Sequence, residues 1–230
     1  MPKFKALAKL YGKALFVFRK KRPFNGVFPF ARQTNQIIFV NMLPGKFYHV
    51  FNHANGSENL FTETRNYHFF LKKLRYHISP VCRLYCYCLL PNHFHLLVSV
   101  REREVLQDLW AKPGQKLSQQ EIELKVSKSF SNFFSCYAQA FNKVYRRRGS
   151  LFIPSMKCTE IKDDWHFCKA VHYIHANPVH HGFTGDIVSW PYSSYRHLLF
   201  GCETFLERHY VFEMLQHKKV LPVFINNQSG

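Results

Sequence analysis

The sequence predicts an α+β fold in which helices pack on one antiparallel sheet. Short apolar runs rich in aromatic and β-branched residues alternate with longer segments whose apolar residues recur at helical intervals. Two of the short runs, residues 83–90 and 93–100, are separated only by Pro91-Asn92, which is typical of an antiparallel hairpin. The order strand, helix, strand, strand, helix, strand, helix places the helices against a single sheet.

The first elements follow from local composition. Residues 47–52 have the composition of a strand, and Asn55-Gly56 marks the turn that ends it. Residues 59–79 carry apolar side chains at helical intervals and end at Pro80. After the hairpin, residues 101–118 are polar and predict a loop.

The second half begins with a long helical pattern at residues 118–146, which ends in basic residues as the helix dipole favours. Residues 151–161 are mixed and strand-like. Asp163 can cap a further helix that runs to about Asn177, where Pro178 is expected to stop it.

The charge of the chain points to a polyanionic partner. The formal net charge is +18, and ten Lys and Arg precede Glu58, the first acidic residue. Such a field favours nucleic acid or an anionic membrane surface. Aromatic residues make up 17% of the chain and suit unstacked bases, although most of the phenylalanines are expected in the core.

Cysteine usage and hydropathy bear on the compartment. The seven cysteines contain no C-x-x-C pair, which favours free thiols in a reducing cytoplasm. No apolar run approaches the roughly 20 residues that a membrane span needs. We therefore expect a soluble cytoplasmic protein.

The chain is long enough for one main domain, and no Ser/Gly-rich linker divides it. We expect this domain at residues 44–200, a basic N-terminal extension at residues 1–43 and a C-terminal tail with a short helix at residues 201–230. The extension is either a basic amphipathic arm for DNA or a membrane, or a peripheral addition to a chain that could start at Met42.

A pair of histidines is the strongest chemical signal. His93 and His95 stand one residue apart on a predicted strand, so both imidazoles leave the same face. The two can hold one metal ion together, while Phe94 and Leu96 point into a core. Histidine pairs also arise by chance in a chain with fourteen histidines, and their packing or exposure is the alternative.

A tyrosine and an asparagine complete the candidate site. Tyr173 and Asn177 stand four residues apart on a predicted helix, so they share one helical face and can present a phenol and an amide to a metal bound elsewhere. On spacing alone, packing of Tyr173 at the border of the core is the favoured interpretation.

Five motifs follow one another along the chain, namely Asn92–Leu97, Phe133–Lys143, Arg148–Phe152, Tyr173–Val179 and Trp190–Tyr195. In this order they resemble the single-tyrosine HUH transposases, and among them most closely the REP-associated tyrosine transposases. The resemblance runs from about residue 47 to residue 195.

The resemblance implies a ferredoxin-like antiparallel sheet and a metal-dependent strand transferase for single-stranded DNA hairpins. Tyr173 would be the nucleophile, forming a 5′-phosphotyrosine, and His93, His95 and Asn177 would hold Mg²⁺ or Mn²⁺. Asn177 stands where related transposases use a glutamine. Nucleic-acid contacts are expected from the basic residues that flank these motifs, namely Arg146, Arg147, Arg148 and Lys157.

The same resemblance implies a protein associated with the bacterial nucleoid, as a monomer or a homodimer. The chain departs from the family at two segments. Residues 153–158 replace a Phe-Lys-Arg-like run, and His53-Ala54-Asn55 replaces Arg-Gly-Asn. These departures affect expected substrate contacts and leave the four proposed active-site residues intact.

Three rival interpretations stay open. The first is a catalytically idle protein that binds hairpin DNA or RNA. The second is a carboxylate-dependent nuclease, for which the chain offers few acidic residues. The third is a different nucleophile, Tyr137 or Tyr145, on the long helix.

Overall fold

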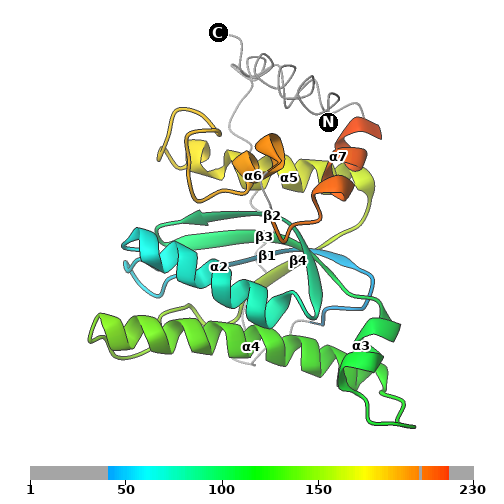
Figure 1. Cartoon of the computed structure of the whole chain (residues 1–230). Helices are drawn as coiled ribbons and strands as arrows, with labels where there is room; N and C mark the ends of the chain where they lie inside the picture. The colour runs from blue at the N-terminus through cyan, green and yellow to red at the C-terminus, as the bar shows by residue number, and fades with distance from the viewer. Residues whose placement is uncertain (1–40, 202–203, 218–230) are drawn as a thin grey trace, which may run out of the picture.

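The computed structural model describes residues 41–201 and 204–217. Its centre is a four-stranded antiparallel sheet with strand order β2-β3-β1-β4, and helices cover both of its faces (Figure 1). The predicted α+β fold with helices packed on an antiparallel sheet is confirmed. The strands are β1 (Phe47–His53), β2 (Cys82–Leu90), β3 (His93–Val100) and β4 (Lys157–Ile161), and the helices are α2 (Thr64–Ile78), α3 (Arg103–Trp110), α4 (Gln119–Val144), α5 (Asp164–His180), α6 (Tyr195–Phe200) and α7 (Arg208–His217).

Two crossover connections interleave in the sheet. The connection β1-α2-β2 encloses β3, and the connection β3-α4-β4 encloses β1. This is the β-α-β-β-α-β order of the split βαβ motif. Helices α2 and α4 lie side by side on one face, and α5, α6 and α7 lie on the other (Figure 1).

The sheet is buried on both faces, and β3 shows how its residues divide between them. All eight residues of β3 are buried. The ring of Phe94 lies 5.1 Å from that of Phe70 on α2 and 5.8 Å from that of Phe134 on α4. Because side chains alternate along a strand, His93 and His95 must leave the opposite face, toward α5.

Capping residues explain where the two long helices of the α2/α4 layer begin. Helix α2 starts at Thr64, five residues later than the pattern predicted, because Glu63 and Asn66 form a reciprocal capping box at that point. Ser118 and Glu121 form the equivalent box at the start of α4. The prediction of a helix at residues 118–146 is therefore confirmed to within two residues at each end.

Three local predictions were wrong. The predicted loop at residues 101–118 contains α3, which buries Leu106 against the core. The strand predicted at residues 151–161 is shortened to β4, preceded by a single bridge from Phe152 to Ala54. Pro178 lies inside α5 and does not stop it.

Helix α5 continues past its proline because hydrogen bonding resumes at once. The N–H of His181 donates to the carbonyl of Asn177 at 3.0 Å, and the N–H of Phe183 donates to that of Pro178 at 2.8 Å. A proline removes one intrahelical donor, and the burial of its ring offsets the loss.

The predicted domain boundaries stay predictions. The apolar and basic pattern of residues 4–22 lies outside the described residues. In the predicted tail, α7 supplies the expected short helix, and its Val211 and Leu215 join the core. In the part of the chain that the structure describes, no helix combines the length and hydropathy needed to cross a membrane.

Candidate active site

Two strands place imidazoles on the sheet face that α5 covers. Strand β3 contributes His93 and His95, and the register pairs His53 of β1 with His93 and Phe51 with His95. Since directly paired residues of antiparallel strands share a face, His53 and His49 of β1 join the same surface. The ring centres of His93 and His95 are 5.2 Å apart.

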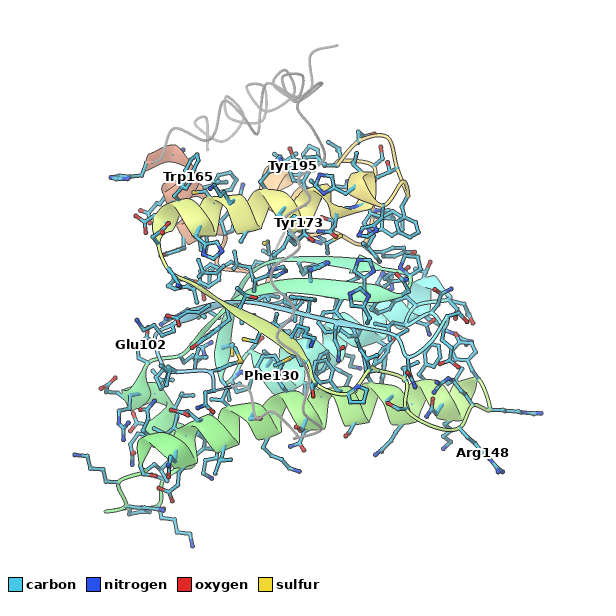
Figure 2. All side chains as sticks on the ribbon, turned by 180° about the vertical axis from the view of Figure 1, so that it is seen from behind. Glu102, Phe130, Arg148, Trp165, Tyr173 and Tyr195 are labelled. Carbon is cyan, nitrogen blue, oxygen red and sulfur yellow. The ribbon has the colours of Figure 1, made fainter. Side chains whose placement is uncertain are left out.

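Helix α5 brings Tyr173 to the border of this surface. The phenol ring centre lies 5.7 Å from that of His95 and 5.8 Å from that of His49. Tyr173 is 42% exposed, whereas both histidines are buried. Figure 2 shows Tyr173 on α5 in the layer above the sheet. The tyrosine can therefore meet a large substrate from solvent while touching the imidazoles.

Asn177 lies one turn further along α5 and is fully buried. Its side-chain Nδ2 donates to the backbone carbonyl of Tyr173 at 2.9 Å, which fixes the orientation of the amide. The opposite atom, Oδ1, is buried and has no hydrogen-bond partner among the described residues. An unpaired buried acceptor is costly, so this oxygen calls for a donor or a cation.

His93 presents a second buried atom of the same kind. Its Nδ1 lies 2.7 Å from Oδ1 of Asn92. An amide oxygen only accepts, so Nδ1 carries the proton and Nε2 keeps its lone pair. That Nε2 is buried and also lacks a hydrogen-bond partner within the described ranges.

The donor set fits a divalent cation. In the neutral ring protonated on Nδ1, His93 Nε2 and Asn177 Oδ1 are both acceptors, and a cation can satisfy both. Only a doubly protonated His93 can donate to the Asn177 amide, and this interaction raises the pKa of His93 against the larger effect of burial. No group of three His, Cys, Asp or Glu side chains in residues 41–201 and 204–217 is placed to hold a metal ion. A third ligand beside His93 and His95 would therefore come from another residue type, and the amide oxygen of Asn177, buried and without a hydrogen-bond partner among the described residues, is a candidate.

Burial keeps the imidazoles uncharged. It lowers the pKa of His49 to about 4 and that of His93 to about 3, and it lowers the pKa of His95 well below its usual value. Neighbouring imidazoles act in the same direction on all three histidines. At neutral pH the rings therefore offer lone pairs, which is the form that binds metal.

Sequence reasoning missed three histidines of this cluster. His49 and His53 follow the same period-2 alternation in β1 as His93 and His95 do in β3, so the signal was present. His181, which follows α5, lies with its ring centre 4.8 Å from that of His93. The position of His181 depends on where α5 ends. Because the helix was predicted to stop at Pro178, the sequence did not place His181 beside His93.

The predicted nucleic-acid contacts divide into three groups. Lys157 pairs with Phe51 across β1 and β4, so it shares the face of the histidines. Arg146 and Arg148 are exposed, and Figure 2 shows Arg148 beyond the end of α4, on the other side of the sheet from Tyr173. Arg147 is held by the protein itself.

The guanidinium of Arg147 joins two segments of the fold. It forms an ion pair with Glu58, donates to Oδ1 of Asn142 at 2.9 Å and donates to the carbonyl of Ser150 at 2.8 Å. These bonds occupy most of its donors. Of the four basic residues predicted to contact nucleic acid, Arg147 therefore stabilises the fold. Ion pairs of Lys157, Arg146 and Arg148 are absent among the described residues.

The rival tyrosines are engaged elsewhere. Tyr137 is buried, its hydroxyl donates to the carbonyl of Leu60 at 2.6 Å, and burial raises its pKa strongly. The hydroxyl of Tyr145 donates to Glu63 at 2.7 Å. Of these three tyrosines, Tyr173 is the one whose ring lies against the imidazoles of His49 and His95.

Comparison with known proteins adds one informative match, and no family model matches the chain. The chain is 30% identical over 111 residues to a protein of Haemophilus influenzae that carries the provisional name REP-associated tyrosine transposase. The match covers 47% of this chain and 56% of that protein, so the chain spans little more than half the length of its curated relative.

A solved structure, described as a REP-associated tyrosine transposase bound to a REP hairpin, aligns with 77% of this chain and 89% of its own, with a TM-score of 0.46 and 18% identity. The sequence match to the Haemophilus influenzae protein supports the resemblance of this chain to the REP-associated tyrosine transposases.

Proposed function

We propose that this protein is a metal-dependent endonuclease and strand transferase that acts on single-stranded DNA containing a hairpin. The observation that carries the proposal is the meeting of three groups on one sheet face. These are the half-exposed phenol of Tyr173, the unpaired Nε2 of His93 and the unpaired Oδ1 of Asn177, with His95 beside them.

His93, His95 and Asn177 would hold Mg²⁺ or Mn²⁺. When bound, such an ion polarises a non-bridging oxygen of the scissile phosphodiester and stabilises the charge that develops on it. All three ligands are neutral, so they leave the charge of the ion available to a phosphate. Simple affinity of imidazole favours Mn²⁺ over Mg²⁺.

Tyr173 would act as the nucleophile. Its phenolic oxygen forms a bond to phosphorus, the bond from phosphorus to the 3′ oxygen breaks, and the 3′ oxygen leaves as a hydroxyl after taking up a proton. The exposed edge of the ring lets solvent accept the phenolic proton. The product is a 5′-phosphotyrosine, and attack of a 3′-hydroxyl on it reverses the step without ATP.

Charge and surface composition support a DNA substrate. The chain carries a formal net charge of +18, and Lys157 lies on the same sheet face as the histidines. A lysine at this position can contact a phosphate next to the scissile one. The proposal leaves open whether the protein acts as a monomer or as a homodimer.

The experiment compares wild type, Tyr173→Phe and the matched control Tyr76→Phe, whose phenol is 74% exposed on α2. Each protein is incubated with 3′-labelled single-stranded hairpin DNA from the flanks of its gene, with Mn²⁺, Mg²⁺ or EDTA. A denaturing gel then separates covalent protein–DNA adducts from free DNA.

We expect a labelled adduct from wild type and Tyr76→Phe with either metal, and none from Tyr173→Phe or with EDTA. An adduct that persists in Tyr173→Phe would show that another residue is the nucleophile. Tight binding without any adduct from wild type would favour the catalytically idle hairpin-binding protein.

A further inference from the structure

The helix layer on the far side of the sheet from Tyr173 carries a one-sided distribution of charge. Helix α2 contains Arg65, Lys72, Lys73 and Arg75 and has no acidic residue. In the sequence, no acidic residue occurs between Glu63 and Glu102 or between Glu123 and Glu160. Most of α2 and α4 therefore has no negative side chain of its own.

The cations of the two helices lie on exposed positions. Lys72 and Arg75 are exposed on α2, and Lys73 is half-buried. Helix α4 adds a stripe at helical spacing, with Lys128, Asn132, Ser135, Gln139 and Lys143 all exposed and Arg146 just beyond its end. We call the cations Lys72, Lys73, Arg75, Lys128, Lys143 and Arg146 the α2–α4 surface.

None of these six cations forms an ion pair among the described residues. The ion pairs of the described residues involve other basic groups, and on α2 only Arg65 is paired, with Glu63. The ammonium of Lys73 instead lies 5.3 Å from the ring centre of Phe69 and 5.9 Å from that of Tyr76. All six cations thus lack an ion-pair partner in the part of the chain that the structure describes, and all of them except Lys73 are exposed.

An open groove lies between the two helices, with one cation of this surface lining it from each side, Lys73 from α2 and Lys143 from α4. Its lining combines ammonium groups with amides and hydroxyls, the side chains that contact phosphate and sugar in protein–DNA interfaces. Helices α2 and α4 lie side by side (Figure 1). The lining residues include Lys73 on α2 and Asn132, Ser135, Gln139 and Lys143 on α4.

We propose that the α2–α4 surface binds the duplex stem of a nucleic-acid hairpin through its phosphates. Packed helices have axes about 8–10 Å apart, so two rows of cations can reach the two phosphate strands that border one groove of a duplex, about 6 to 12 Å wide in B-form DNA. A single strand would need only one row. The exposed large hydrophobic side chains of the two helices are Tyr76 on α2 and Leu124 and Val144 on α4. Leu124 and Val144 stand near opposite ends of α4, so they form no continuous apolar stripe, which disfavours insertion into a membrane.

The inference assigns different parts of one substrate to different layers of the fold. The stem would bind the α2/α4 layer, and the strand to be cut would reach Tyr173 on the α5 side. It also gives a place to Arg146, which was predicted from sequence to bind nucleic acid and which extends the row of α4. The inference rests on the proposed function for the identity of the polyanion as a hairpin.

The test compares the variant Lys72→Ala/Lys143→Ala with the control Lys112→Ala/Lys116→Ala, which removes two exposed lysines from the segment between α3 and α4. Binding of a labelled hairpin with a duplex stem is measured by fluorescence anisotropy in EDTA, from about 50 to 200 mM salt. Anionic phospholipid vesicles serve as a competitor.

Loss of two phosphate contacts should reduce the slope of log K against log salt concentration by about 2, about 1 for each lysine, in the first variant only. The inference would be overturned if the two variants had equal slopes or if wild type did not bind the hairpin. It would also be overturned if wild type bound the vesicles as strongly as the hairpin and lost that binding with the same two lysines.

The covalent-adduct assay separates this inference from the proposed function. With single-stranded flank DNA that lacks the stem, we expect Lys72→Ala/Lys143→Ala to form the Tyr173 adduct as wild type does. A slope change confined to this variant supports the surface even if wild type forms no adduct, in which case only the proposed catalysis fails. Loss of the adduct on stemless DNA would assign these lysines to the cut strand and overturn the division of the substrate.

Discussion

The imidazole of His49 meets that of His95, with Nε2 of His49 2.9 Å from Nδ1 of His95. Both rings are buried, and their centres lie 5.0 Å apart. The bond occupies Nδ1 of His95 and leaves Nε2 as the nitrogen available to a cation. Histidine ligands of metals commonly use their second nitrogen in this way, which fixes the ring and its tautomer.

We expect His49→Ala to weaken Mn²⁺ binding by about 10- to 100-fold, the usual cost of losing such a partner. His49→Gln should recover part of the affinity because its amide can reach His95. Electron paramagnetic resonance of free Mn²⁺ measures the effect without reference to cleavage. His53→Gln is the control, because the ring of His53 stacks on that of His93, with ring centres 4.7 Å apart, and His53 is not the histidine that bonds His95. Unchanged affinity in His49→Ala would remove His49 from any role in positioning His95.

Substitution of Asn177 should separate metal binding from nucleophilic attack. Asn177→Ala deletes the unpaired Oδ1, so we expect Mn²⁺ affinity to fall by more than about tenfold and adduct formation to disappear with it. Tyr173→Phe should lose the adduct and keep wild-type Mn²⁺ affinity. If both variants bind Mn²⁺ as wild type does, Asn177 is not a ligand.

Arg147→Ala should destabilise the fold. The substitution leaves Glu58, Asn142 and the carbonyl of Ser150 without their donor, and we expect a loss of about 1–3 kcal/mol in the free energy of unfolding. Urea denaturation provides the measurement. Arg148→Ala, which removes an exposed neighbour, should leave the midpoint unchanged. A similar shift in both variants would argue that the effect is one of overall charge.

Tyr137→Phe should also lower stability, because it leaves the buried carbonyl of Leu60 without its partner at 2.6 Å. The expected cost is about 1–3 kcal/mol. Tyr76→Phe removes an exposed hydroxyl from α2 and should cost nothing measurable by thermal or urea unfolding. Adduct formation by folded Tyr137→Phe is expected to persist, and its loss would reopen Tyr137 as a candidate nucleophile.

Local spacing predicted much of the fold and which side chains share a face at the candidate site. Alternation along β3 correctly separated His93 and His95 from Phe94, and helical spacing correctly put Tyr173 and Asn177 on one side of α5. The capping pair of Ser118 and Glu121 marked the start of α4. These features depend on residues within one or two turns of each other, so the sequence carries them directly. The catalytic and metal-binding roles stay predictions.

Long-range packing decided the rest. The pairing of β1 with β3 brought His49 and His53 to the metal-ligand candidates. In the folded protein His49 is buried and His53 half-buried, and this loss of solvent lowers the pKa of both. Helix α5 also continues through Pro178, which is buried, although a proline locally favours the end of a helix.

The basic run after α4 shows the same limit. Arg146, Arg147 and Arg148 look alike in the sequence, yet Arg147 binds Glu58 while its neighbours face solvent. The sequence by itself determined which side chains share a face of one strand or helix, because that follows from a repeat of 2.0 or 3.6 residues. Only the tertiary structure decided which faces meet, because strand register and helix packing depend on contacts between residues far apart in the chain.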